Sequence, residues 1–474
     1  MQDFIQKIKN NEIDIVEHTH KVIGECKKIN KEYNYFNTIS EDLALGQAKQ
    51  LKKDIKNKNT KNKKLLGVAI SVKDNICVKN VESTAGSRIL KGYKPLFDAT
   101  VIKKVKEAGG IIIGKTAQDE FGFGSFSVNV GLDFEIPKNP FDKQRSCGGS
   151  SGGAAGLSQI AEFPHIALGE STGGSIVEPA AFCGVFGLCP TYGRVSRYGL
   201  IDYANSLDKI GSLGKNLHDN ALLLETISGF DDNESTTINK PIDKYTEFVN
   251  NNKNNQKNIK VGIIKEAFKD IDNKVDKGVR QGIKKLEEQG VKAEEISLKL
   301  PIEHGLSTYY ILATSEASTN LAKYCGMRYG ISDKLEGNFN EFFTQVRSHN
   351  LGPEAKRRII LGTFARMSGY RDAYYIKATK VRAKIVNEYK KMFKKFDALI
   401  SPTAPILPPK FSEIEKLSPL QQYMMDIMTV SPNLAGLPHL NVPVGFSDKL
   451  PVGMLLTADH LQESKLIQLG SVFQ

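Results

Sequence analysis

Short apolar runs of strand length alternate with helical segments along this chain, and this alternation constrains its fold more than any other feature. LLGVAISV (65–72) is a continuous apolar run, as expected for a strand covered on both faces. Apolar residues at helical spacing follow between Asp98 and Gly109 and predict a helix, and three isoleucines at 111–113 predict the next strand. Later segments repeat the alternation, with strand-like runs at 165–172, 260–266 and 397–405 and a helix over 275–290. The pattern predicts one large α/β unit.

The chain shows no internal repeat, and its 474 residues suffice to bury a large core. Apolar residues at helical spacing before residue 57 predict two amphipathic helices, within a helical N-terminal segment over 1–60. An Asn-rich stretch at 249–258 predicts an exposed connector. We therefore expect a single domain over 1–474.

The basic balance of the chain invites a nucleic-acid hypothesis, because 65 Lys and Arg face 53 Asp and Glu, a net charge of +12. Much of the excess comes from one polar segment, 52–64, whose lysines carry no interleaved Arg or aromatic residue. Such clusters are more often solvated surface than an RNA-binding groove. The lysines of this segment are Lys52, Lys53, Lys56, Lys58, Lys61, Lys63 and Lys64.

Other classes of protein are disfavoured by what the sequence lacks. No apolar run reaches the roughly 18 residues of a membrane-spanning helix, and the N-terminus has no signal-peptide core. The six cysteines form no CxxC pair and the histidines form no HExxH pattern. We therefore expect a cytoplasmic protein with reduced thiols, no membrane contact and no metal site.

One motif match is a coincidence. Gly109, Gly114, Lys115 and Thr116 satisfy the phosphate-loop expression GxxxxGK[ST]. A phosphate loop follows a strand and opens a helix, whereas here a helix comes first and the intervening residues include three isoleucines. β-branched residues resist the turn conformations that such a loop requires.

Two glycine-rich clusters, GGSSGG (148–153) and GESTGGSIVEPAAFCG (169–184), point to chemistry. One such cluster alone is typical of a flexible loop, but two flanking an α/β segment predict backbone that turns tightly around a ligand. A serine nucleophile needs a base, and neither cluster contains histidine. Lys73 ends the first predicted strand, where burial could make it a neutral base. A solvated Lys73, or one paired with Asp74, remains the alternative.

The motifs GVAISVKDNI, CGGSSGGAAG and STGGSI with PAAFCGVFGL together resemble the amidase signature family. The resemblance runs from about residue 40 to near the C-terminus and implies a central, mostly parallel or mixed sheet covered by helices on both faces. Later blocks at 190–211, 315–330, 356–375 and 433–438 resemble one branch of that family, the ammonia-producing subunits of tRNA-dependent amidotransferases.

The family uses a Ser–cis-Ser–Lys triad. Transferred to this sequence, the resemblance implies Ser175 as the nucleophile, Lys73 as the base and Ser150, after a cis Gly149–Ser150 peptide, as the bridging serine. Backbone N–H groups of the segment Thr172, Gly173, Gly174 and Ser175 would hold the oxyanion.

The resemblance also implies a substrate pocket for glutamine. Arg358 would pair with the α-carboxylate, Asp426 would take the α-amino group and Tyr309 would line the pocket. The neighbours Arg357 and Tyr310 could fill those places instead.

The sequence departs from the family pattern near the nucleophile. Ser171 and Val177 stand where many members have Asp and Arg, which indicates joint loss of one charge pair. Glu170 and Glu178 now flank the site and could alter local pKa values. Ser151 is a weaker candidate for the bridging role. Cys189 replaces a Lys outside the proposed chemistry.

The resemblance implies glutamine hydrolysis without a cofactor in this chain. The ammonia would pass to a B subunit that activates Glu-tRNA(Gln), or Asp-tRNA(Asn), with ATP and Mg²⁺. A small C subunit would join the complex, and charged tRNA would bind mainly through the partner. A free-standing amidase for small amides and a non-catalytic, RNA-contacting subunit remain the alternatives.

Overall fold

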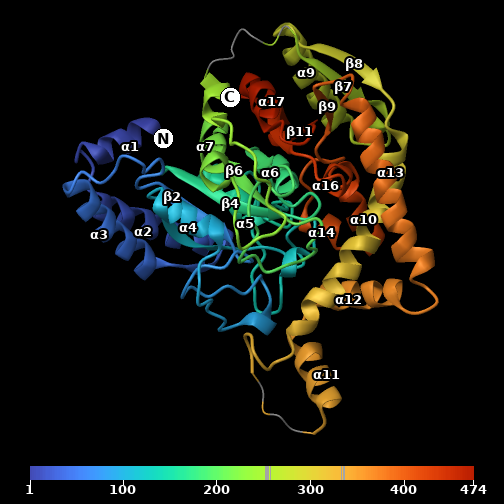
Figure 1. Ribbon diagram of the computed structural model, residues 1–474, viewed down its shortest axis with the longest axis horizontal. Coiled ribbons are helices and arrows are strands. Elements are labelled where there is room, and N and C mark those ends of the chain that lie inside the picture. Colours follow the sequence, from blue (N-terminus) through green and yellow to red (C-terminus); the bar gives the residue numbers. More distant parts are fainter. Residues whose placement is uncertain (251–255, 257, 333, 335–336) are drawn as a thin grey trace.

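A computed structural model describes the chain except for residues 251–255, 257, 333 and 335–336 (Figure 1). Most of the predicted 249–258 connector therefore lies outside the described residues. Of its described residues, Val249 and Gln256 are buried and Asn258 is exposed.

One mixed sheet of eleven strands runs through the molecule, in the order β1-β3-β2-β4-β6-β5-β10-β11-β9-β7-β8. Parallel pairs join β2 to β3 and β4, and β7 to β8 and β9, whereas the other neighbours are antiparallel. The predicted mixed α/β sheet is confirmed, with antiparallel pairs in its middle. The strands are β1 (Phe36–Ile39), β2 (Ala69–Lys73), β3 (Ile111–Thr116), β4 (His165–Ser171), β5 (Phe186–Cys189), β6 (Lys209–Gly214), β7 (Lys260–Ile264), β8 (Lys292–Ile296), β9 (Ala398–Pro402), β10 (His439–Ser447) and β11 (Leu450–Ala458).

Helices surround this sheet, and none among the described residues is long and apolar enough to cross a membrane. The helices are α1 (Gln2–Lys9), α2 (Ile15–Tyr33), α3 (Glu41–Lys56), α4 (Thr100–Glu107), α5 (Gly152–Ile160), α6 (Val177–Cys183), α7 (Leu217–Ile227), α8 (Tyr245–Asn250), α9 (Asn273–Glu288), α10 (Lys299–Asn320), α11 (Phe339–Asn350), α12 (Pro353–Arg366), α13 (Lys377–Met392), α14 (Phe411–Ile414), α15 (Pro419–Tyr423), α16 (Val430–Leu434) and α17 (Glu463–Gly470).

The predicted elements occur where the apolar patterns place them, with shifts at their ends. The run at 65–72 becomes β2 only from Ala69 onward, because residues 65–68 form a turn. Helix α4 ends before Gly109, whose φ of +84° breaks the helix. The N-terminal segment differs from the prediction of two helices: it has three, with the short strand β1 between α2 and α3. Four residues of strand are too few to stand out against helical spacing.

Helices cover both faces of the sheet, as β11 shows. Gly453 packs against Ala181 of α6, since a Cβ at Gly453 would lie 2.5 Å from the Ala181 side chain. The next residue, Met454, contacts Gly282 of α9. Successive residues of a strand point to opposite faces, so α6 and α9 lie on opposite sides of the sheet. Glycine allows the close approach in both places.

Two large apolar clusters form the core. The first surrounds the strands, and the second lies among α10, α11, α12 and α13, at the right and lower right of Figure 1. The second cluster includes Phe123, Tyr203 and Tyr309. These aromatic residues lie between the sheet and the helical layer, and they form one wall of the candidate site.

The phosphate-loop match runs from the turn after α4 into the strand β3 and opens no helix, which confirms that it is a coincidence. Lys115 is fully buried within β3 and donates hydrogen bonds to the Asp74 carbonyl and Ser83. Burial lowers the pKa of Lys115. Its ammonium holds the turn after β2 and is unavailable to a phosphate.

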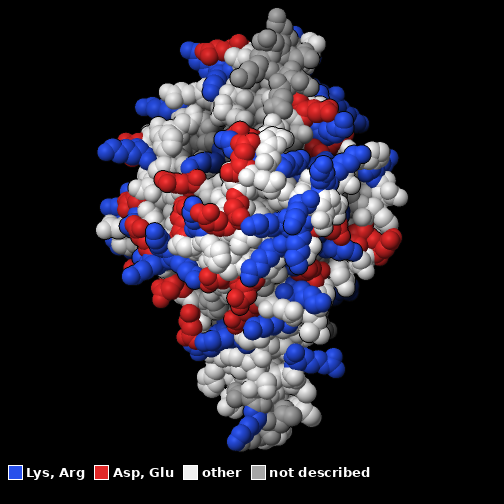
Figure 2. All heavy atoms as spheres, turned by 90° about the vertical axis from the view of Figure 1, so that its left-hand side faces the viewer, with Lys and Arg blue, Asp and Glu red and all other residues white. Residues whose placement is uncertain are grey.

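The lysine-rich segment begins on α3 and continues into a turn. Three of its lysines pair with carboxylates of the same chain, Lys52 with Asp14, Lys63 with Asp54 and Lys64 with Glu225. Figure 2, which faces the N-terminal side of the molecule, shows basic and acidic side chains interspersed over this surface. These pairings favour the interpretation of a solvated, partly neutralised surface.

The contact between α10 and α12 should depend on Gly362. A Cβ at Gly362 would lie 1.8 Å from the Thr314 carbonyl oxygen, so Gly362→Ala must push α12 away from α10. We expect a loss of about 1–3 kcal/mol in the free energy of unfolding, measured by denaturant unfolding. Gly46 is the matched control, because it lies in α3 with nothing within 4 Å of its Cβ position. Gly46→Ala should raise stability by about 0.5–1 kcal/mol, and equal effects in both variants would contradict the packing argument.

Candidate active site

The site begins where two parallel strands end. Lys73 is the last residue of β2, and its neighbour β4 ends at Ser171, so both strands deliver their C-terminal residues to the same edge of the sheet. Lys73 is fully buried. Its Nζ lies 2.7 Å from Ser150 Oγ, 2.9 Å from the Glu170 carbonyl oxygen and 2.9 Å from Glu170 Oε2. The structure therefore brings Lys73 and Ser150 into direct contact.

Lys73 does not pair with Asp74, which was the alternative from sequence. Asp74 turns the other way, where its carboxylate accepts hydrogen bonds from Thr84 and Gly86 N and lies 3.4 Å from Lys115 Nζ. The two side chains point in opposite directions, so only that of Lys73 lies in the candidate active site.

Ser150 lies in the first glycine cluster, just before α5. The Gly149–Ser150 peptide is cis, as the resemblance implies. A Cβ at Gly149 would lie 2.2 Å from Asp119 Oδ2, so only glycine allows this approach. Ser151 contacts backbone instead: its Oγ donates to the Glu170 carbonyl oxygen at 3.2 Å and its N–H to the Ser175 carbonyl oxygen at 3.2 Å. Among these serines, Ser150 is the partner of Lys73.

Ser175 stands in the tight turn between β4 and α6 and is buried. Within the described structure, the backbone N–H groups of Gly173, Gly174 and Ser175 donate no hydrogen bond, which leaves them available to an oxyanion. The turn packs closely, since a Cβ at Gly174 would lie 2.5 Å from Thr429 Oγ1 and one at Gly173 would lie 3.1 Å from Tyr309. Tyr309 therefore lies directly against residues 172–175, the candidate oxyanion segment.

The two departures from the family charge pair fit an uncharged environment. Ser171 is buried and donates a hydrogen bond from Oγ to the Gly173 carbonyl oxygen at 3.0 Å. Val177 is buried in the apolar core at the start of α6. Both positions are satisfied without charge, which supports a compensated structural change.

Arg358 is held inside a cage of aromatic rings. Its side chain is 3% exposed, against 42% for that of Arg357, so only Arg358 faces the interior. Its Nε donates to Glu354 at 2.8 Å and one terminal nitrogen donates to Tyr203 OH at 2.7 Å. The guanidinium lies between 5.1 and 5.7 Å from four ring centroids, those of Phe123, Tyr203, Tyr310 and Tyr423. The cage holds the guanidinium, with its forked N–H donors, in one orientation.

Asp426 and Glu178 form a buried acid pair beside Gly174. Asp426 accepts hydrogen bonds from Tyr310 OH at 2.8 Å and Ser125 Oγ at 3.0 Å. Burial raises the pKa of both Asp426 and Glu178, and the nearby Asp426 carboxylate adds to the rise at Glu178. The Glu178 oxygens accept no hydrogen bond from the described residues, whereas a protonated Glu178 can donate one to Asp426. Tyr310, a sequence alternative to Tyr309, thus orients Asp426.

Sequence reasoning missed several residues that shape the site. Glu354 and Tyr203 orient Arg358, and Tyr423 donates to Glu354 while stacking on Tyr310. Glu354 could have been found, because it precedes Arg358 by one helical turn. The tyrosines come from distant segments, and no local signal marks them.

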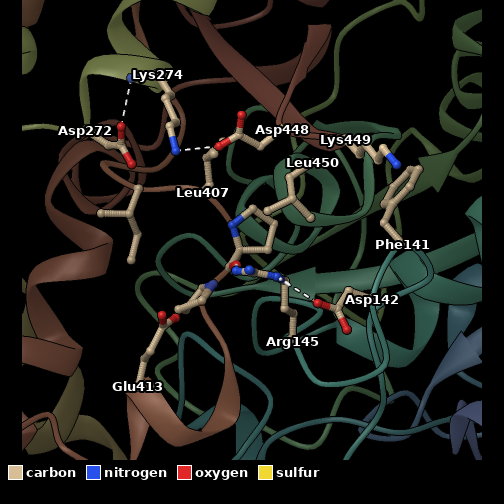
Figure 3. Close-up of a pocket in the computed structure, with 13 residues that line it drawn as sticks. Phe141, Asp142, Arg145, Asp272, Lys274, Leu407, Glu413, Asp448, Lys449 and Leu450 are labelled. Carbon is tan, nitrogen blue, oxygen red and sulfur yellow. Dashed lines mark hydrogen bonds and ion pairs between the residues drawn. The ribbon is translucent and has the colours of Figure 1, made fainter.

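One hollow of the surface lies away from this constellation. It encloses about 510 Å³ beside the start of α9 and the β10–β11 turn (Figure 3). Four of its charged side chains form pairs, Lys274 with Asp448 and Arg145 with Asp142. A second hollow, of about 420 Å³, is lined by Glu354 and Arg357 and lies next to the Arg358 cage. No group of three or more His, Cys, Asp or Glu side chains suited to a metal ion occurs among the described residues.

The family model described as Amidase matches residues 17–467, so the chain belongs to this family, as its glycine–serine motifs predict. It is an enzyme of the amidase type. Among curated relatives, the A subunit of the glutamyl-tRNA(Gln) amidotransferase of Halothermothrix orenii is 42% identical over 470 residues, covering 99% of this chain and 94% of the relative. Its namesake from Geobacillus sp. (strain WCH70) is 41% identical, covering 100% and 96%.

Solved structures agree with these relatives. The A subunit of the glutamyl-tRNA(Gln) amidotransferase of Thermotoga maritima matches with a TM-score of 0.78 and 35% identity, covering 96% of this chain and 90% of that one. The peptide amidase of Stenotrophomonas maltophilia matches with a TM-score of 0.79 at 23% identity, over 99% and 95%. The second match shows the shared fold, and the first also shows the branch of the family.

Glu120 should make stability depend on pH. It accepts hydrogen bonds from Ser87 and from Gly352 N–H, just before α12, and burial raises its pKa from 4.5 to about 7. The folded chain therefore holds this proton more tightly than the unfolded chain. The resulting stabilisation is complete below pH 4.5 and is lost as the pH rises through about 7.

Glu120→Gln is uncharged at every pH and should lack this loss. Relative to the parent, its free energy of unfolding should rise by up to about 3 kcal/mol between about pH 5 and about pH 8. Urea unfolding at both pH values measures the difference. A difference that does not change with pH would show that Glu120 is not the titrating group.

Proposed function

We propose that this chain hydrolyses glutamine and supplies the ammonia with which a tRNA-dependent amidotransferase converts Glu-tRNA(Gln) to Gln-tRNA(Gln). The observation that carries the proposal is the contact of the buried Lys73 with Ser150, beside the Ser175 turn with its unbonded N–H groups. The relatives that share the full length of the chain support the branch of the family.

The geometry supports a serine mechanism without histidine. Neutral Lys73 takes a proton from Ser150, which takes one from Ser175, and Ser175 Oγ attacks the side-chain amide carbon of glutamine. The N–H groups of Gly173, Gly174 and Ser175 stabilise the negative oxygen that forms. The proton then passes from Lys73 to the departing ammonia, and water attacks the acyl enzyme to release glutamate.

The substrate pocket follows from the caged arginine and the acid pair. The Arg358 fork suits the α-carboxylate of glutamine, and Asp426 with Glu178 suits its α-ammonium. Tyr309 would line the pocket beside the oxyanion segment. These three contacts select a free amino acid over a simple amide, because a simple amide has neither the α-carboxylate nor the α-ammonium that the two charged groups would bind.

Ammonia production has a use only if the ammonia is consumed nearby. We propose that the chain works with a B subunit, which binds charged tRNA and activates its glutamyl group with ATP and Mg²⁺, and with a small C subunit. Asp-tRNA(Asn) is a second acceptor of the same chemistry. The names of the relatives, which describe one subunit of a larger enzyme, support a complex.

Removal of the nucleophile should abolish the reaction. Ser175→Ala should lower glutamine turnover by at least about 10⁴-fold, measured as glutamate release by the chain with its partners and charged tRNA. Ser151→Ala is the matched control, because Ser151 donates to backbone carbonyls, and we expect it to stay within about tenfold of the parent. Unchanged turnover in Ser175→Ala would contradict the mechanism, and activity on simple amides alone would favour a free-standing amidase.

The two neighbouring arginines offer a test of the pocket. Arg358→Lys loses the fork and should raise KM for glutamine by about 10- to 100-fold, because one charge-assisted hydrogen bond is worth about 1.5–3 kcal/mol. Arg357→Lys keeps the charge of an exposed side chain and should leave KM near the parent value. The opposite ranking would assign the α-carboxylate to Arg357.

A further inference from the structure

The outward face of α12 is apolar, although the helix lies at the surface of the helical layer (Figure 1). Helix α12 buries one face against α10, where Arg358 and Gly362 lie. Ile360 and Phe364 are exposed on the other face, one helical turn apart, and Met367 is exposed three residues later. A surface helix ordinarily places polar side chains on its outward face, so this face is built for a contact.

The apolar surface continues beyond the end of α12. The ring centroid of Phe364 lies 4.4 Å from that of Tyr370 and 5.7 Å from that of Tyr374. Six of the seventeen large apolar or aromatic side chains that are exposed in the described chain fall between 360 and 374, so they form one patch rather than scattered single residues. This α12 patch consists of Ile360, Leu361, Phe364, Met367, Tyr370 and Tyr374.

Another hollow, of about 510 Å³, adjoins the α12 patch. It lies between the first half of α10 and the start of α13, and Tyr374 belongs both to its wall and to the patch. Its wall also includes the apolar side chains of Leu300, Ile311 and Val381. An apolar hollow beside an exposed apolar patch suits an anchoring side chain of a bound protein.

The edge of the patch is basic. Between residues 356 and 384 the chain has nine Lys or Arg residues and one acidic residue, Asp372. Arg371 follows Tyr370 and is exposed, and the exposed Lys377 and Lys384 line the hollow. These three side chains have no carboxylate partner within the part of the chain that the structure describes. Their charge is therefore free to attract an acidic partner.

The combination of an apolar centre and a basic edge decides the class of the partner. In a two-fold dimer of this chain each patch would meet its own copy, so the basic edges would face and repel each other. A phosphate backbone would match the basic edge, but it would leave the aliphatic Ile360, Leu361 and Met367 in water. A different protein chain with an apolar centre and an acidic edge matches both features.

The patch lies on the same helix as the proposed substrate contact. Arg358 is on the inner face of α12, two residues before Ile360, and is held there by the aromatic cage. An α-helix with its side chains is about 10–12 Å across. A chain bound to the patch would therefore lie about one helix away from the proposed glutamine pocket.

We propose that the α12 patch, with the adjoining hollow and the basic edge, is the docking surface for a partner subunit that presents an apolar centre and an acidic edge. The inference rests on the proposed function, because that function requires a second chain to use the ammonia. It adds the place of contact on this chain and the chemistry of the surface that binds there.

Ile360→Glu tests the apolar centre. Ile360 is 67% exposed, so a charge placed there meets the partner without entering the core. The Kd of the full chain for the B and C subunits together, measured by isothermal titration calorimetry, should rise at least about 30-fold. Leu96→Glu is the matched control, because Leu96 is 84% exposed outside the patch, and its Kd should stay within about twofold of the parent. Equal Kd values for Ile360→Glu and the parent would overturn the proposal.

Lys377→Glu tests the basic edge. The reversed charge should repel an acidic edge, so stopped-flow association with the B and C subunits should slow by about tenfold at low salt and approach the parent rate at about 0.5 M salt. Lys103→Glu makes the same change of charge at an exposed position of α4 and should change the rate by less than about twofold. An unchanged or faster association of Lys377→Glu would show that the edge of the partner is not acidic.

The parent chain offers a test that needs no variant. Hydroxyl-radical footprinting should show that Ile360, Phe364 and Met367 lose reactivity when the B and C subunits bind, whereas Leu96 keeps its reactivity. Unprotected side chains on α12 would overturn the docking surface. A dimer of the chain alone that Ile360→Glu dissociates would overturn it too, as would loss of tRNA binding in an Ile360→Glu enzyme whose subunits still assemble. A parent that binds its partners but hydrolyses no glutamine would instead overturn the proposed function.

Discussion

The burial of the Lys73 amine is the constraint on which the rest of the site depends. An amine in the protein interior must have a partner for each of its hydrogens. Lys73 finds them in the Ser150 hydroxyl and in two oxygens of Glu170. Because these partners come from the loop before α5 and from β4, the lysine ties both glycine clusters to the end of β2. The proposed bridging serine and the turn of the proposed nucleophile are therefore held in place by one side chain.

That arrangement requires backbone to approach backbone more closely than side chains allow. Gly149 lies against Asp119, Gly174 against Thr429 and Gly362 against Thr314, each within the space that a Cβ would occupy. The first two hold the serine loops against the segments that contain Asp119 and Thr429, and the third brings α12, with Arg358, onto α10. Glycine thus sets the distance between the nucleophile side and the substrate side of the site.

Much of the fold could be predicted, and a triad could be proposed, because their signals are local. Apolar runs located β2, β3 and β4, and the motif order indicated Lys73, Ser150 and Ser175. The antiparallel β10–β11 hairpin in the sheet could not be read from these runs, because an apolar run does not encode the direction of its neighbour. The sequence also left Arg357 and Arg358 open, since only burial distinguishes them.

The sequence by itself determined the family, the α/β class and the residue types of the reaction, because these depend on patterns within short segments. Only the tertiary structure decided which charges meet. The Asp74 carboxylate lies beside Lys115, so Lys73 pairs with Glu170 instead. Asp208, which is far along the chain, accepts a hydrogen bond from Thr172. The physical reason is that a buried charge is tolerated only beside a suitable partner, and partners drawn from distant strands are brought together by folding alone.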